Sequence, residues 1–129
     1  MRAAIPALVL SLCLPLAAPA FETEEERFFT AEGPQSREVS ILSTTDTPVL
    51  APVIAALQKD RPGIAVRYTV ASSQEVFSAI YDEGRPFDLV ISSAMDLQMK
   101  LANDGFAAPH VSAQTALVPA WAHWQDRLY

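Results

Sequence analysis

From residue 38 onward, short runs of β-prone residues alternate with longer stretches that have the periodicity of an α-helix. The β-prone runs cover residues 39–42, 64–70 and 87–91. Strands that alternate with helices are typical of βαβ units, in which the strands are parallel and each helix carries the chain back across the sheet. The pattern therefore predicts an α/β fold built on a parallel sheet.

The β-prone runs differ in pattern, and the difference predicts their order in the sheet. Residues 64–70 alternate apolar with more polar side chains, which is typical of an edge strand with one partly wet face. Residues 87–91 are apolar except for Asp88, as expected of a strand buried on both faces in the middle of a sheet. Because crossovers between parallel strands are right-handed, the first strand is expected between the other two, in the order 2-1-3.

The helical stretch at residues 49–59 has apolar residues at positions i, i+3, i+4 and i+7, which predicts one stripe that faces the sheet. The stripe consists of Leu50, Val53, Ile54 and Leu57. A hydroxyl residue precedes each helical stretch: Thr47 the first, Ser72 the second and Ser93 the third. We expect these three residues to cap the helices.

With the order 2-1-3, the connections that follow the first and third strands leave toward opposite faces of the sheet. Open α/β sheets bind ligands in the crevice between the carboxyl ends of two such strands. The loops that line this crevice cover residues 43–46 and 92–95. Both loops are rich in hydroxyl groups, and each leads into a helix whose N-terminal N–H groups and dipole favour a carboxylate or phosphate. The same hydroxyls can also serve only as helix caps, and the two roles are compatible.

Residues 1–20 have the features of a secretory signal peptide, with a basic residue, an apolar stretch and small side chains at residues 18–20. The mature chain is expected to begin near Phe21 in the periplasm, with residues 21–37 as an acidic leader. The single cysteine, Cys13, lies inside the signal. The mature domain is therefore expected to fold without disulfides or thiolate metal sites.

The charge of the chain bears on its partners. The formal net charge of −6 at pH 7 becomes −7 once Arg2 is removed with the signal. Nucleic acid and anionic lipid would repel such a surface, so a small solute is the expected partner and nucleic acid is not.

The sequence has no motif typical of an enzyme or of a cofactor site. There is no nucleophile elbow, phosphate-binding loop or dinucleotide fingerprint. The histidines, His110 and His123, have no second residue at metal-ligand spacing. Trp121 and Trp124 are expected to pack against other structure rather than to stack on a ligand. We therefore expect no catalysis, no metal and no cofactor.

Four stretches carry a resemblance to a known family. They are residues 39–46, 62–66, 86–98 and 101–105. They resemble the N-terminal lobe of the periplasmic solute-binding proteins of ABC transporters, and in particular the branch of iron(III)-binding and phosphoglycerate-type receptors. The resemblance covers residues 39–129 and is most specific at residues 87–98.

The resemblance implies a two-lobed, monomeric protein that closes on a solute and delivers it to an ABC transporter permease. It also implies that the first lobe binds the solute through the two loops of the crevice. The expected ligand-binding residues are Thr44, Thr45, Asp46, Ser92, Ser93 and Ala94. Among them Asp46 is the one candidate for the carboxylate that iron-binding relatives often contribute from this lobe.

A complete member of the family needs about three hundred residues for two lobes and a hinge. Residues 38–129 are therefore expected to be a partial N-terminal lobe that leaves a sheet edge and apolar surface uncovered. Two other roles remain open on the sequence. One is a periplasmic sensor or regulatory subunit that signals to a membrane histidine kinase, and the other is a truncated fragment without function.

Overall fold

The computed structural model describes residues 21–110 and 112–122. The expected signal peptide lies outside the described residues, as do Cys13, His123 and Trp124. The strands are β1 (Glu25–Phe29), β2 (Arg37–Ser43), β3 (Ile64–Val70) and β4 (Leu89–Ile91). The α-helices are α1 (Thr47–Asp60), α2 (Ser73–Tyr81) and α3 (Met95–Asn103), and short 3-10 helices cover Ala113–Leu117 and Ala120–Ala122. In this part of the chain no helix is long and apolar enough to cross a bilayer.

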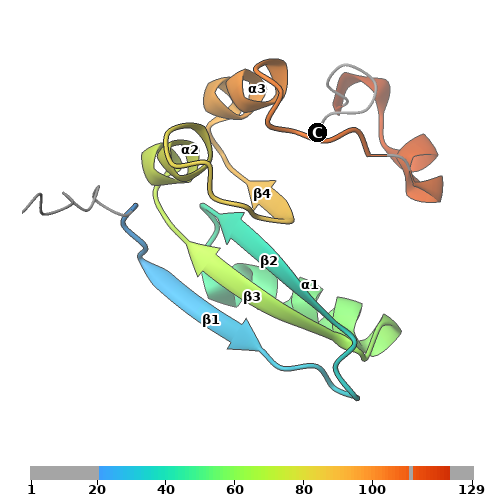
Figure 1. Cartoon of the computed structure of the whole chain (residues 1–129). Helices are drawn as coiled ribbons and strands as arrows, with labels where there is room; N and C mark the ends of the chain where they lie inside the picture. The colour runs from blue at the N-terminus through green and yellow to red at the C-terminus, as the bar shows by residue number, and fades with distance from the viewer. Residues whose placement is uncertain (1–20, 111, 123–129) are drawn as a thin grey trace, which may run out of the picture.

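The four strands form one sheet in the order β1-β3-β2-β4 (Figure 1). Strand β2 runs parallel to β3 on one side and to β4 on the other, whereas β1 is antiparallel to β3. The three strands predicted from the sequence thus lie in the predicted order, 2-1-3. The α/β fold class is confirmed, with the first predicted strand at the centre of the three.

The prediction that residues 64–70 form an edge strand was wrong, because β1 covers that edge. Strand β1 comes from the segment expected to be only an acidic leader, and it pairs with β3 along its whole length. The polar positions of β3 have another cause. The guanidinium of Arg67 lies 3.1 Å from Glu26 on β1 and 2.9 Å from Glu38 on β2, so its charge is satisfied by both neighbouring strands.

The prediction that the third strand lies in the middle of the sheet was also wrong for the part described. Strand β4 pairs with β2, and its other edge has no strand beside it among residues 21–110 and 112–122. Its apolar run is explained by contacts on both faces, since Val90 and Ile91 pack against different hydrophobic clusters. Leu89 is 46% exposed. The strand therefore has the composition of an internal strand but an open edge.

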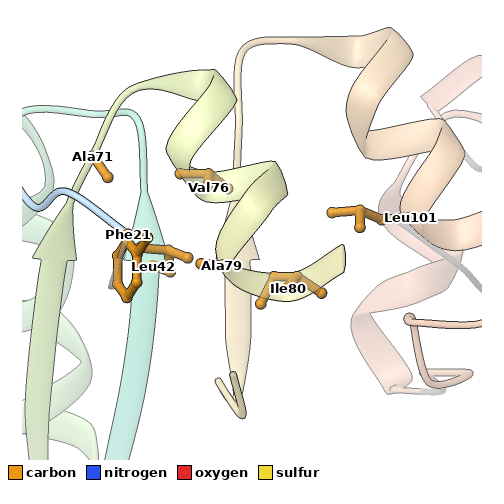
Figure 2. Close-up of a cluster of buried hydrophobic side chains, with 7 residues drawn as sticks. All are labelled: Phe21, Leu42, Ala71, Val76, Ala79, Ile80 and Leu101. Atoms are coloured by element: carbon orange, nitrogen blue, oxygen red, sulfur yellow. The ribbon is translucent and has the colours of Figure 1, made fainter. Parts of the chain in front are cut away.

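Two hydrophobic clusters cover the two faces of the sheet. Helix α1 packs on one face over Ile41, Val66 and Tyr68. Helices α2 and α3 cover the other face, where Phe21 from the N-terminal segment joins a cluster of buried side chains (Figure 2). The other members of this second cluster are Leu42, Ala71, Val76, Ala79, Ile80 and Leu101.

The apolar stripe predicted for α1 is rotated from its expected position. Ile54 is buried, but Val53 is 61% exposed and Leu57 is 37% exposed. The buried face includes Gln58, whose Nε2 donates hydrogen bonds to the carbonyl oxygens of Thr30 (2.8 Å) and Ile64 (3.0 Å). Because these carbonyls satisfy the amide, a polar side chain can occupy the position that apolar periodicity assigned to Leu57.

Asp88 connects the start of β4 to the central strand. Its Oδ2 accepts hydrogen bonds from the backbone N–H and the hydroxyl of Ser40, both at 2.8 Å. The backbone N–H of Ser40, followed by its hydroxyl, lowers the pKa of the Asp88 carboxyl below its ordinary value. A carboxyl whose pKa is lowered on folding stabilises the protein above the unfolded pKa, and this stabilisation is lost as pH falls through the folded pKa.

We expect the Asp88→Asn variant to be less stable than the wild type at pH 7 by about 1 kcal/mol, a modest value because the carboxyl is largely exposed. We also expect the gap to shrink between pH 7 and an acidic pH below the folded-state pKa of Asp88, where the wild-type carboxyl becomes protonated. Urea denaturation at both pH values measures this, with Asp60→Asn as a control at the exposed end of α1. A gap that is equal at both pH values would contradict the assignment.

Candidate functional site

The two loops predicted to line a crevice lie side by side at the carboxyl ends of β2 and β4. The backbone N–H of Thr44 donates to the carbonyl of Ile91 at 3.0 Å. The backbone N–H of Ser93 donates to Oγ1 of Thr44 at 3.1 Å, and the Thr44 hydroxyl donates to Oγ of Ser93 at 3.4 Å. Hydrogen bonds between loops that are 49 residues apart in sequence therefore fix their relative position.

Both loops make the same local turn. The hydroxyl of Ser43 accepts a hydrogen bond from the N–H of Thr45 at 2.9 Å, and the hydroxyl of Ser92 accepts one from the N–H of Ala94 at 3.2 Å. A serine that accepts from the residue two positions later is a common way to turn the chain. In each case the turn ends a parallel strand and leads within a few residues into a helix, α1 or α3.

The predictions that Thr47 and Ser93 cap α1 and α3 were wrong, because neither helix has a side-chain cap. The N-cap residues are Asp46 for α1 and Ala94 for α3. Thr47 lies inside the first turn of α1, and the Ser93 backbone is bonded to Thr44. The predicted cap of α2 is confirmed, because the Ser72 hydroxyl accepts from the N–H of Glu75 at 3.2 Å.

Two helices with uncapped N-termini therefore begin beside the tied loops. In α3 the first helical hydrogen bond runs from the N–H of Gln98 to the carbonyl of Ala94, so the N–H groups of residues 95–97 precede the helical ladder. Such groups and the helix dipole attract negative charge. The carboxylates of Asp46 and Asp96 lie in the same region, and the two loops contain no Lys or Arg.

The structure brings the six predicted ligand-binding residues to one edge of the sheet. Asp46 and Ser93 are exposed, and the other four are half-buried: Thr44, Thr45, Ser92 and Ala94. They differ in the hydrogen bonds that they already make. The Thr44 hydroxyl is occupied in the tie between the loops, whereas the Asp46 carboxylate makes no side-chain cap.

Sequence reasoning missed one residue of this region, Tyr68. The alternating pattern of β3 predicts only an apolar, inward-facing position for Tyr68, yet its hydroxyl donates a hydrogen bond of 2.6 Å to the carbonyl of Thr45. The side chain is 0% exposed. A tyrosine at an inward position of a strand is itself a signal, because a buried phenol normally requires a hydrogen-bond partner.

A cavity of about 510 Å³ lies away from these loops, along the open edge of β4. It is lined mainly by apolar side chains, including Phe87, Leu89 and Phe106. Gln98 also lines it: Nε2 donates to the carbonyl of Val90 at 3.1 Å, and the buried Oε1 has no partner within the described residues. The Gln98 amide thus bonds a carbonyl of the open strand, as the N–H of a neighbouring strand would.

The histidine and tryptophan of the described part lie outside the two loops. His110 borders the cavity beside β4, and Trp121 is largely exposed. Across residues 21–110 and 112–122, no three His, Cys, Asp or Glu side chains come close enough to hold a metal ion.

A family model and a solved structure both match this chain. The family model described as bacterial extracellular solute-binding protein matches residues 39–123. A solved structure, the substrate binding protein of the ABC transporter from Agrobacterium tumefaciens, is similar with 36% sequence identity and a TM-score of 0.75. The match covers 84% of this chain and 33% of that chain, so this chain spans about a third of its length. A search of curated proteins found no match.

Proposed function

This chain belongs to the family of bacterial extracellular solute-binding proteins, and on that premise we propose that it captures a small solute for uptake through an ABC transporter. The observation that carries the proposal is the pair of hydrogen-bonded loops at the carboxyl ends of β2 and β4. Adjacent parallel strands whose connections leave toward opposite faces form the position at which open α/β sheets bind ligands. The role is binding and delivery rather than catalysis.

The chemistry of the two loops bears on the class of solute. Uncapped helix N-termini favour an anionic group, since their N–H groups and dipoles stabilise negative charge. The exposed Asp46 carboxylate repels an anion that is bound without a metal ion, but it attracts a metal ion that is bound together with an anion. We propose a solute that carries an anionic group, alone or with a metal ion, which fits the iron(III)-binding and phosphoglycerate-type branch. The binding residues proposed are those of the two loops.

We further propose that the described domain is part of an N-terminal lobe, and that a second lobe closes over the loops. Among the described residues, β4 has an open edge and Gln98 Oε1 has no partner, which supports further structure beside β4, because strand edges are normally covered and buried amides are normally paired. The family works in the periplasm or outside the cell, and we assign residues 1–20 as the signal that directs export. The membrane partner is an ABC transporter permease, and the complete protein is a monomer.

The Asp46→Asn variant separates the two kinds of solute. If the solute is a bare anion, removing the carboxylate removes a repulsion and binding of inorganic phosphate or 3-phosphoglycerate becomes several-fold tighter. If the solute carries a metal, binding of ferric citrate becomes weaker by about tenfold or more. Calorimetric titration of the intact protein measures both.

The matched control for this titration is Asp60→Asn at the far end of α1, which is expected to leave both affinities unchanged. Equal effects of the two substitutions would contradict a solute site at the loops.

A further inference from the structure

We propose that Tyr68 is a positioning residue for the solute site, and that it acts by orienting the peptide between Thr45 and Asp46. The proposal rests on the proposed function, because it concerns the same two loops. Tyr68 is not expected to touch the solute, since its side chain is fully buried among Ile41, Ile54 and other core residues.

The orientation follows from the geometry of one peptide unit. The Tyr68 hydroxyl holds the carbonyl of Thr45 toward the core at 2.6 Å. The peptide is trans, so its C=O and N–H groups point in opposite directions. The N–H of the same unit belongs to Asp46, and it is therefore directed away from Tyr68 and the core.

The rest of the loop leaves this peptide little freedom. The N–H of Thr45 is held by the Ser43 hydroxyl, and the carbonyl of Asp46 accepts from the N–H of Val49 at the start of α1. Thr44 is tied to the second loop. The Asp46 N–H is thus a fixed donor at the positive end of α1, where it is oriented to bind an anionic group.

The hydroxyl and the ring of Tyr68 have separable roles. The ring fills the core beneath α1, and a phenylalanine ring occupies the same space. The hydroxyl makes a hydrogen bond to a loop carbonyl 23 residues away in sequence. Tyr68→Phe therefore removes the hydrogen bond to the loop while it keeps the packing of the ring in the core. Tyr81→Phe is the matched control, because its hydroxyl accepts from Lys100 Nζ at 3.3 Å on the other side of the sheet.

The first arm of the test needs no solute. In the intact ¹⁵N-labelled protein, Tyr68→Phe is expected to move the backbone amide signals of residues 44–47, most strongly that of Asp46, and to leave a cooperative melt. Tyr81→Phe is expected to leave those signals in place. An unchanged Asp46 signal in Tyr68→Phe would overturn the proposal, and so would a variant that does not fold, because the hydroxyl would then be needed for the fold itself.

The second arm measures binding of inorganic phosphate as the probe. Tyr68→Phe is expected to weaken binding about tenfold, and Tyr81→Phe to leave it unchanged. Equal phosphate affinity in the wild type and Tyr68→Phe would overturn the proposal. If the wild type binds no phosphate, the bare-anion form of the proposed function fails, while the amide signals of the first arm still decide whether Tyr68 orients the peptide.

Discussion

A chain truncated to begin at Gln35, so that residues 21–34 are missing, is expected to lose cooperative folding. The deletion removes all of β1, which pairs with β3 from Glu25 opposite Val70 to Phe29 opposite Val66. It also removes Phe21 from the buried cluster between α2 and the sheet. The Thr30 carbonyl, which accepts a hydrogen bond from the buried Gln58 amide, is lost as well. These losses together are expected to exceed the stability margin of a small domain, about 5 to 10 kcal/mol.

The measurement is a thermal melt followed by far-ultraviolet circular dichroism, with dye binding to report exposed apolar surface. The matched control is Glu24→Gln, which removes a charge from the same segment but keeps the backbone N–H that donates to the carbonyl of Val70. The control is expected to melt as the wild type does. A truncated chain that melts cooperatively near the wild-type temperature would show that β1 is dispensable.

The second large effect is expected from Leu42→Ala in the central strand. Leu42 is fully buried under α2 (Figure 2). It is followed directly by Ser43, with which the first loop begins. Truncation of a buried leucine removes apolar contacts and leaves a cavity, which costs about 3 kcal/mol. Urea denaturation of the intact protein measures the change in the free energy of unfolding.

Leu117→Ala is the control for the same change of side chain at a position that is 78% exposed. Its expected cost is below about 0.5 kcal/mol. If the two substitutions have equal costs, β2 does not lie at the centre of the domain as described.

Local patterns in the sequence predicted the parallel part of the fold well. The alternation of apolar side chains marked β3 at its observed bounds, Ile64–Val70, and Ser72 with Glu75 marked the start of α2. The order 2-1-3 was inferred from right-handed crossovers together with an edge position for residues 64–70 and a central one for residues 87–91. The order is confirmed, although neither of these two positions is observed in the described sheet. The loops at the carboxyl ends of β2 and β4 could be placed together because of this order.

The errors concern contacts between distant parts of the chain. The sequence of β1, Glu-Glu-Arg-Phe-Phe, is too charged to be recognised as a strand, and its place depends on pairing with β3 about 40 residues later. Burial of Gln58 depends on the carbonyls of Thr30 and Ile64. Polar side chains such as these are normally expected to be exposed. Here their places are set by hydrogen bonds to distant parts of the chain, which leave no periodic pattern in the sequence.

The candidate site was predictable in location and not in detail. The six loop residues lie together as expected, but the hydroxyls around them make other bonds than helix caps. Those of Ser43 and Ser92 close turns, and the Thr44 hydroxyl joins the first loop to Ser93 of the second. The role of Tyr68 depends on one hydrogen bond to Thr45, which no local pattern predicts. Side-chain hydroxyls can satisfy several alternative backbone partners, so their partners are set by the folded structure.

The most direct test of solute capture at these loops is a crystal structure of the intact protein purified with its natural solute. We expect solute atoms within hydrogen-bond distance of residues 43–47 and 92–96, with the Asp46 N–H among the donors. A solute bound elsewhere, for example in the cavity beside β4, with both loops unoccupied, would contradict it.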